Sequence, residues 1–230
     1  MIWALVPAKL GASAKERLGG ALSPAARIEL SRAMLHDVVV ALRGAEAIER
    51  VAVISRDPHA LDLATGLGAI ALRESHARTL NQAVAEGVAA CVAGGASAVA
   101  IAMGDLPLLA STDVDRAIAA LPERGAVAAP SLDGSGTNLL ALRPPAALAT
   151  RFGPDSLALH RRAASDAGLR LRVLLLPSAA LDLDTPDDLE RLLASAIPHT
   201  ATASFFAAQG LARRDVARAA AAGSASGALP

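Results

Sequence analysis

Short apolar runs alternate with longer amphipathic stretches along most of the chain. The apolar runs predict buried strands, and the stretches between them have the spacing and start signals of helices. Strands are expected at residues 2–6, 51–55, 69–72, 97–105, 126–130, 138–142 and 169–176. Helices are expected at about 23–43, from 57, and at 79–93, 111–121, 154–167 and 185–195. This alternation is typical of an α/β domain with a mainly parallel sheet, in which ligands bind beyond the carboxyl ends of the strands.

The pattern changes towards the C-terminus. Residues 1–196 are interpreted as one domain, and residues 197–230 as an alanine-rich extension that is partly helical or disordered. A helix is expected at 203–222, with an apolar face formed by Phe205, Phe206 and Leu211. This helix would dock on the domain or on a second subunit, and the second case would make the protein a homodimer.

The charge balance excludes several classes of partner. The 230 residues carry 22 basic and 22 acidic side chains, so the formal net charge is zero. This gives no electrostatic footprint for nucleic acid or an anionic membrane, and no uncharged apolar run is long enough to span a bilayer. The N-terminal segment lacks a basic region before its short apolar run, so it is interpreted as a strand and not as a signal peptide. A cytoplasmic protein without membrane or nucleic-acid partners is expected.

Cysteine and histidine give no sign of a metal cluster. The single Cys91 excludes an internal disulfide and is interpreted as a small core residue. The histidines lack the paired spacing of metal ligands and are interpreted as surface or capping residues; they are His36, His59, His76, His160 and His199.

Four carboxylates are concentrated in the sequence LDLDTPDDL, residues 181–189. Thr185 and Pro186 have the pattern of a helix start, where the two acids that follow are favoured by exposed N–H groups. Asp182 and Asp184 precede this cap and are expected at or just past the end of the last strand, on one face and about 7 Å apart. Their repulsion, about 2 kcal/mol, favours a bound divalent metal ion, and a solvated strand end is the alternative.

The other candidate residues also fall near the carboxyl ends of predicted strands. Lys9 and Lys15 follow the first strand and are the only lysines beside 20 arginines, which suggests a site that needs a compact ammonium group, with chance clustering as the alternative. Ser55 ends the second strand and Asp105 ends a central one. Three carboxylates near two lysines suit Mg²⁺ bound to a nucleoside triphosphate, because Mg²⁺ prefers oxygen ligands and lysines neutralise phosphates.

A second group of motifs lies in the other half of the chain. The sequence GSGTN (134–138) could form a nest of backbone N–H groups for an anion, with the Thr137 hydroxyl as a further donor. The sequence FGPDS (152–156) predicts a helix start, which also attracts phosphate or carboxylate. Each motif is common in turns and helix starts without a ligand, but together they suggest a second anionic ligand beside the nucleotide.

Taken in order, these motifs resemble a known family. VPAKLGASAKERL, GDLPLL, GSGTN, RFGPDS and LDLDTPDDL, within about residues 3–195, are similar to the 2-phospho-L-lactate or phosphoenolpyruvate guanylyltransferases of coenzyme F420 biosynthesis. The resemblance implies a single-domain, three-layer α/β/α nucleotidyltransferase fold, Rossmann-like and similar to that of the molybdenum-cofactor guanylyltransferases. It also implies an enzyme that uses GTP and Mg²⁺, couples GMP to a small phosphorylated carboxylic acid and releases pyrophosphate. The acid would be phosphoenolpyruvate, 2-phospho-L-lactate or 3-phosphoglycerate.

The resemblance also implies roles for individual residues. Asp105, Asp182 and Asp184 match metal-binding acids. Lys9, Lys15 and Arg17 match the triphosphate loop, and Lys9, Lys15 and Asp105 are the expected catalytic residues. Ser55 and Asn81 lie in motifs expected near the nucleotide, and the positions that hold the acid substrate are matched by Thr137, Gly153 and Ser156. Asp155 departs from the family, which commonly has a small residue at this position.

Two other classes of protein fit parts of the pattern. A metal-dependent glycosyltransferase also binds a nucleotide with an Asp-x-Asp motif, although that motif usually follows a strand in the middle of the chain. A non-catalytic nucleotide-binding or interaction module is the second alternative, favoured by the alanine-rich extension.

Overall fold

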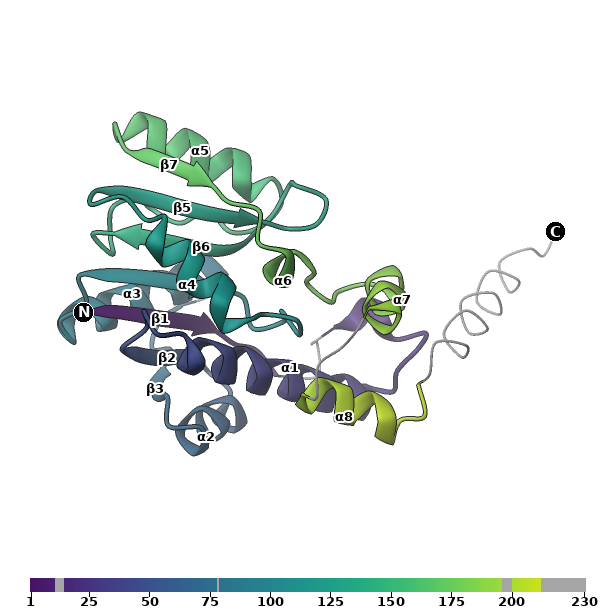
Figure 1. Cartoon of the computed structure of the whole chain (residues 1–230). Helices are drawn as coiled ribbons and strands as arrows, with labels where there is room; N and C mark the ends of the chain where they lie inside the picture. Colours follow the sequence, from purple (N-terminus) through teal and green to yellow (C-terminus); the bar gives the residue numbers. More distant parts are fainter. Residues whose placement is uncertain (11–14, 78, 196–199, 212–230) are drawn as a thin grey trace.

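A seven-stranded sheet lies at the centre of the molecule (Figure 1), in the order β3-β2-β1-β4-β6-β5-β7. The computed structural model describes residues 1–10, 15–77, 79–195 and 200–211. All neighbouring strands are parallel except β6, which is antiparallel to β4 and β5. The expected mainly parallel sheet is therefore confirmed. The strands are β1 (Ile2–Pro7), β2 (Arg50–Ser55), β3 (Ile70–Arg73), β4 (Ala98–Ala102), β5 (Gly125–Pro130), β6 (Thr137–Arg143) and β7 (Arg170–Val173).

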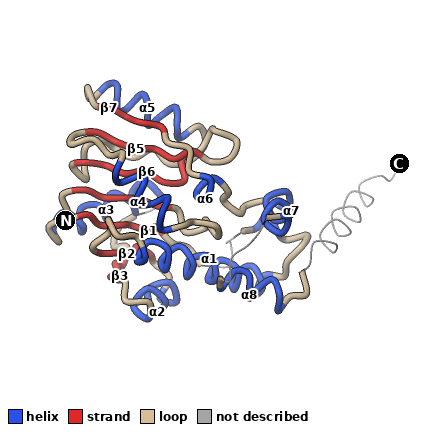
Figure 2. Tube along the Cα trace, viewed as in Figure 1, coloured by secondary structure: helices blue, strands red, loops and turns tan. Residues whose placement is uncertain are grey.

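Helices cover both faces of the sheet (Figure 2). Successive side chains of a strand point to opposite faces, so Ala4 and Val6 of β1 join one apolar core while Trp3 and Leu5 join the other. The first core packs against α1 (Pro24–Gly44), α2 (Pro58–Gly66), α4 (Ser111–Ala119) and α6 (Pro177–Ala180). The second packs against α3 (Leu80–Ala93) and α5 (Ser156–Asp166), and it includes Cys91 as predicted. The three-layer α/β/α architecture is confirmed.

A third apolar cluster lies beyond the carboxyl ends of the parallel strands. The N-terminal half of α1 extends past the sheet and packs there with the short helix η1 (Glu16–Leu18), α7 (Pro186–Ala194) and α8 (Ala201–Ala208) (Figure 1). Phe205 and Phe206 of α8 are buried in this cluster. The Asp37 carboxylate of α1 accepts hydrogen bonds from the N–H groups of Ala201 and Thr202, at 2.9 and 2.8 Å.

The C-terminal predictions are only partly covered by the described residues. The helix expected at 203–222 begins at Ala201 and ends at Ala208, and Leu211 packs against the third cluster. The boundary expected between residues 196 and 197, and the extension from residue 212 onwards, lie outside the described residues. No helix in the described ranges is long and apolar enough to cross a bilayer.

Two predicted strand ends are wrong. The strand expected at 169–176 stops at Val173, and Pro177 then begins α6, so Asp182 and Asp184 do not end a strand. Among the described strands β7 lies at the edge of the sheet and pairs with β5 alone, and this pairing stops at Val173. The strand expected at 97–105 stops at Ala102, and Asp105 lies in the turn that follows.

Candidate active site

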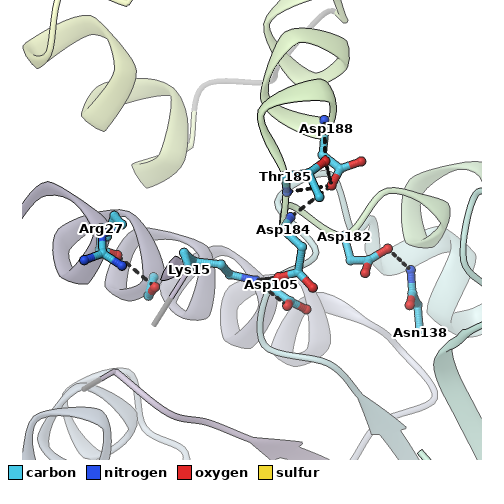
Figure 3. A network of polar contacts seen from close by, with 9 residues as sticks. Lys15, Arg27, Asp105, Asn138, Asp182, Asp184, Thr185 and Asp188 are labelled. Atoms are coloured by element: carbon cyan, nitrogen blue, oxygen red, sulfur yellow. Dashed lines mark hydrogen bonds and ion pairs between the residues drawn. The ribbon is translucent and has the colours of Figure 1, made fainter. Parts of the chain in front are cut away.

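An ammonium group bridges two of the candidate carboxylates (Figure 3). The Lys15 Nζ lies 2.6 Å from Asp105 Oδ2 and 2.6 Å from Asp184 Oδ1. The Lys15 side chain is only 9% exposed, compared with 27% for Asp105 and 48% for Asp184. Burial opposes the charge on Lys15, but the two carboxylates outweigh it and raise the pKa of the ammonium above its ordinary value. Lys15 is therefore a charged lysine held between two aspartates.

The bridge joins segments that are far apart in the sequence. Lys15 has left-handed backbone angles, with φ of 52°, and precedes η1. Asp105 follows β4, and its backbone carbonyl accepts a hydrogen bond from the Leu183 N–H at 3.2 Å. Leu181 and Leu183 are buried in the third cluster, whereas Asp182 and Asp184 are partly exposed. The alternation of apolar and acidic residues predicted for this segment is therefore present, although the segment is not a strand.

Asp182 is held by Asn138 of β6. The Asn138 side-chain amide donates to Asp182 Oδ1 at 3.1 Å and also to the carbonyl oxygens of Ala179 and Ala180. Burial raises the pKa of the Asp182 carboxyl, the Asn138 bond opposes this, and the negative charges of Asp105 and Asp184 raise it further. The three predicted metal ligands therefore lie close enough to interact electrostatically.

Two of these three aspartates hold a cation that belongs to the chain itself. No group of three or more His, Cys, Asp or Glu residues could hold a metal ion in the part of the chain that the structure describes. The Lys15 ammonium lies between Asp105 and Asp184, where it balances their charge. The other oxygen of Asp105, Oδ1, is buried and has no hydrogen-bond partner among the described residues.

Three cavities adjoin at this edge of the sheet. The first, of about 660 Å³, is lined by the three aspartates together with Arg17, Thr137, Gly153 and Ser156. The second, of about 250 Å³, is lined by Lys9, Lys15, Asp105 and Asp184. The third, of about 600 Å³, is lined by Lys9 and Ser55 and shares Leu80 with the other two. The structure therefore gathers the predicted residues of the metal, the triphosphate and the acid around connected spaces.

The loop between β5 and β6 folds around a carboxylate of its own. Asp133 accepts hydrogen bonds from the Ser131 hydroxyl and from the hydroxyl and N–H of Ser135. These bonds lower the pKa of the Asp133 carboxyl to about 2, and the bond from the Ser131 hydroxyl has the largest effect. The Gly136 N–H donates to the Ser131 hydroxyl. The Gly134 N–H also donates to the Ser131 carbonyl at 2.9 Å, so the nest predicted for an external anion already uses three of its N–H groups within the loop.

Thr137 is hydrogen-bonded to a histidine that sequence analysis missed. His160 of α5 is fully buried, and its Nδ1 lies 3.1 Å from Thr137 Oγ1. Its Nε2 accepts a hydrogen bond of 2.9 Å from the Arg151 N–H, and its ring packs edge-on against Phe152. Burial lowers the pKa of His160 to about 4. The prediction of a surface or capping histidine is wrong here, because only the packing of α5 on the sheet shows that this residue is buried.

Asn81 and Ser55, predicted near the nucleotide, make contacts to the backbone. The Asn81 amide accepts from the Phe152 N–H at 2.8 Å and donates to the Phe152 carbonyl at 2.9 Å. Asn81 thereby fixes the loop that contains Gly153. The Ser55 hydroxyl donates to the Ala8 carbonyl and accepts from the Asp57 N–H. Because its single hydrogen is used, Ser55 shapes the third cavity and has no hydrogen left to donate to a ligand.

Solved structures show which class of protein has this fold. A putative nucleotide-diphospho-sugar transferase from Desulfovibrio desulfuricans matches with a TM-score of 0.76 over 94% of this chain and 97% of that chain, at 19% identity. A nucleotidyl transferase from Methanothermobacter matches with a TM-score of 0.59 over 83% of this chain and 95% of that chain, at 15% identity. At such identities the likeness concerns the fold alone. The fold is therefore the one found in these nucleotidyltransferases.

Sequence comparison identifies the family. A family model described as "Guanylyl transferase CofC like" matches residues 2–208. A phosphoenolpyruvate guanylyltransferase from Rubrobacter xylanophilus is 45% identical over 84% of this chain and 94% of its own length. A 3-phospho-D-glycerate guanylyltransferase from Phenylobacterium zucineum is 38% identical over 82% and 88%, and a 2-phospho-L-lactate guanylyltransferase from Methanothermobacter thermautotrophicus is 37% identical over 83% of each chain. The chain belongs to the CofC-like guanylyltransferase family, which confirms the predicted resemblance. These matches do not favour the alternatives of a glycosyltransferase or a non-catalytic module.

Proposed function

We propose that the protein transfers GMP from GTP to the phosphate of a small phosphorylated carboxylic acid and releases pyrophosphate, as a step in coenzyme F420 biosynthesis. The observation that carries this proposal is the first of the three cavities, of about 660 Å³, in which the three aspartates and the predicted acid-binding residues line one space. The lysine-lined cavity beside it shares Asp105 and Asp184, so two anionic ligands can meet at these carboxylates.

The chemistry requires positioning and charge balance more than a protein nucleophile. The phosphate of the acid is already an anion and attacks the α-phosphorus of GTP, and the bond to the leaving pyrophosphate breaks. Both reactants are polyanions, so cationic groups must reduce their repulsion. Lys9, Lys15 and Arg17 lie at the cavities where the triphosphate would bind. Thr137, Gly153 and Ser156 would hold the acid.

Mg²⁺ is the expected cofactor, although no group of three or more His, Cys, Asp or Glu residues in the described ranges is arranged to hold a metal ion as the site stands, with Lys15 between two of the acids. Asp105, Asp182 and Asp184 offer the oxygen ligands that Mg²⁺ prefers, and the buried Oδ1 of Asp105 has no partner in the described ranges. The Lys15 bridge supports a cation site, because Asp105 and Asp184 share one cation there. If the Lys15 ammonium moved to a phosphate, Asp105 and Asp184 could hold the metal, which would neutralise phosphate charge in the transition state.

Phosphoenolpyruvate is the acid that we expect. Relatives named phosphoenolpyruvate guanylyltransferase are 33% to 45% identical to the chain, and those named for 3-phospho-D-glycerate and 2-phospho-L-lactate are 38% and 37% identical, so this expectation rests on the 45% match. GTP is the expected nucleotide because these relatives are all named guanylyltransferases. A cytoplasmic location and a homodimer stay predictions.

The deciding experiment measures pyrophosphate release with Mg²⁺ and GTP against each of the three acids separately, with ATP and CTP as controls. Release with GTP and phosphoenolpyruvate alone is expected. Release with another of the three acids would retain the reaction and change the substrate. GTP binding without release on any of the acids would overturn the proposed reaction.

A further inference from the structure

The hydrogen bonds of His160 determine which of its ring nitrogens carries the proton. The Arg151 N–H can only donate, so His160 Nε2 must accept and is unprotonated. Burial also disfavours the doubly protonated ring, and a proton on Nε2 would face the donor of Arg151. The neutral ring therefore carries its proton on Nδ1, which donates to Thr137 Oγ1 at 3.1 Å.

This donation determines the direction of the Thr137 hydroxyl. A threonine hydroxyl has one hydrogen and accepts through its oxygen lone pairs. Because one lone pair receives the His160 proton, the hydroxyl hydrogen points elsewhere, and no second partner of this hydroxyl is found within residues 1–10, 15–77, 79–195 and 200–211. Thr137 lines the cavity of about 660 Å³, and it is 4% exposed, so its position is held by packing.

We propose that His160 is a positioning residue that makes the Thr137 hydroxyl a hydrogen-bond donor to the anionic acid substrate. This inference rests on the proposed function, in which Thr137 holds the acid. An unassisted hydroxyl can rotate and present a lone pair to the anion, which would repel it. With His160 as the fixed donor behind it, the hydroxyl presents its hydrogen to the substrate instead.

The two ring nitrogens can be tested separately with two amide side chains. In His160→Asn the side-chain amide can occupy the place of Nδ1 and donate to Thr137, but nothing replaces Nε2. In His160→Gln the longer side chain can accept from the Arg151 N–H in the place of Nε2, but it leaves Thr137 without its donor. Both variants lose part of the ring packing on Phe152, so they are matched in that respect.

Steady-state kinetics of pyrophosphate release then distinguish positioning from general support of the loop. We expect the KM for the acid to be about tenfold higher in His160→Gln than in His160→Asn, the size expected for one hydrogen bond to a charged group. The KM for GTP should change less than twofold in both. In a Thr137→Val background, which has no hydroxyl, His160→Gln should cause no further rise. His59→Gln, an exposed histidine at the start of α2, is the control for the exchange itself.

Three results would overturn the inference: equal acid KM values in the two His160 variants, a larger rise in His160→Asn, or an undiminished effect of His160→Gln in the Thr137→Val background. The protonation state has its own readout, because long-range ¹H–¹⁵N spectra of the histidine rings distinguish the tautomers. A signal that is absent from His160→Gln and shows a protonated Nε2 would exclude the proposed direction. If wild-type protein showed the expected tautomer but no turnover with any acid, the proposed function would fail while this hydrogen-bond geometry stood.

Discussion

Asp184 is the more exposed carboxylate of the Lys15 bridge, so its charge contributes more to the site than to folding. It is 48% exposed, and an ion pair at such a position stabilises a protein by about 1 kcal/mol or less. We expect Asp184→Asn to lower turnover by about 100-fold or more, because it removes a carboxylate that holds the cation facing the phosphates, while the melting temperature changes by only a few degrees. Asp187→Asn is the matched control, because Asp187 lines the same cavity and is exposed in the first turn of α7. Near-wild-type turnover in Asp184→Asn would contradict the proposed role.

His160 should make the folding stability depend on pH in a defined window. Its folded pKa of about 4 lies below the ordinary 6.5, so between these values the unfolded chain binds a proton that the folded chain does not. The contribution of the neutral His160 to the free energy of unfolding is fully present above pH 6.5 and is lost as the pH falls towards 4.

Urea unfolding of the wild type and His160→Asn at pH 7 and pH 5 tests this window. Because the carboxylates titrate in both proteins, the difference between them isolates His160. The wild type is expected to lose about 1–2 kcal/mol more than the variant between these two pH values. Equal losses in the two proteins would show that His160 does not contribute as described.

At the scale of elements, α3 and α5 together hold the loop that carries Gly153. Asn81, in the first turn of α3, bonds both polar backbone groups of Phe152, and His160 of α5 bonds the preceding N–H. The loop backbone is therefore fixed by side chains from two helices on the same face of the sheet. Because the loop is already ordered, an anion can bind there without the entropic cost of ordering the backbone.

Asn81 provides a test of this arrangement. Asn81→Ala removes both bonds to Phe152, whereas Asn81→Asp keeps the acceptor and loses the donor. We expect the KM for the acid to rise about tenfold in Asn81→Ala and less in Asn81→Asp, with the KM for GTP within about twofold of wild type. A larger rise in the KM for GTP would instead support the role near the nucleotide that the family resemblance implies.

The sequence predicted elements well where their signals are local. Thr185 accepts a hydrogen bond from a backbone N–H group at the start of α7, as its cap pattern predicts, and the helices expected from residues 23 and 79 begin with the hydroxyl caps Ser23 and Thr79. The end of β7 was missed because it depends on pairing with β5, which the pattern of VLLL does not contain. His160 was missed for the same kind of reason, since its partners belong to β6 and to the loop before α5. By contrast, the rule that ligands bind at the carboxyl ends of strands brought Lys15 and Asp105 together correctly.

At the scale of the whole molecule, the third cluster connects the C-terminal helix to the segment that carries the acids. Phe206 is 3% exposed and packs with Phe205 at 5.5 Å between ring centroids. Leu183, which lies between Asp182 and Asp184 in the sequence, belongs to the same cluster.

Phe206→Ala should lower the free energy of unfolding by about 3 kcal/mol, because the lost burial leaves a cavity. This corresponds to a fall of roughly 2–4 °C in melting temperature for each kcal/mol. Ser204→Ala, an exposed change in the same helix, should leave the melting temperature nearly unchanged. An unaltered melting temperature in Phe206→Ala would show that α8 contributes nothing to stability.

The Lys15 bridge joins distant parts of the chain, since its two partners lie 90 and 169 residues further along the sequence. It acts as a counterion that the protein carries permanently, so a metal ion arriving at Asp105 and Asp184 has to displace a charge that already satisfies them. A triphosphate would offer the ammonium another anionic partner and lower this cost, and such linkage is reciprocal. Metal loading and nucleotide loading should therefore be cooperative.

Calorimetric titration with Mg²⁺ alone tests this consequence. Lys15→Met should bind Mg²⁺ at least about fivefold more tightly than wild type in the absence of nucleotide, a coupling of roughly 1 kcal/mol. Lys9→Met, which removes an exposed lysine from the same cavity, should not. Equal Mg²⁺ affinities in all three proteins would mean that Lys15 does not compete with the metal ion for the two carboxylates. If the difference is found, Lys15 disfavours Mg²⁺ binding in the absence of substrate, and nucleotide binding removes this effect.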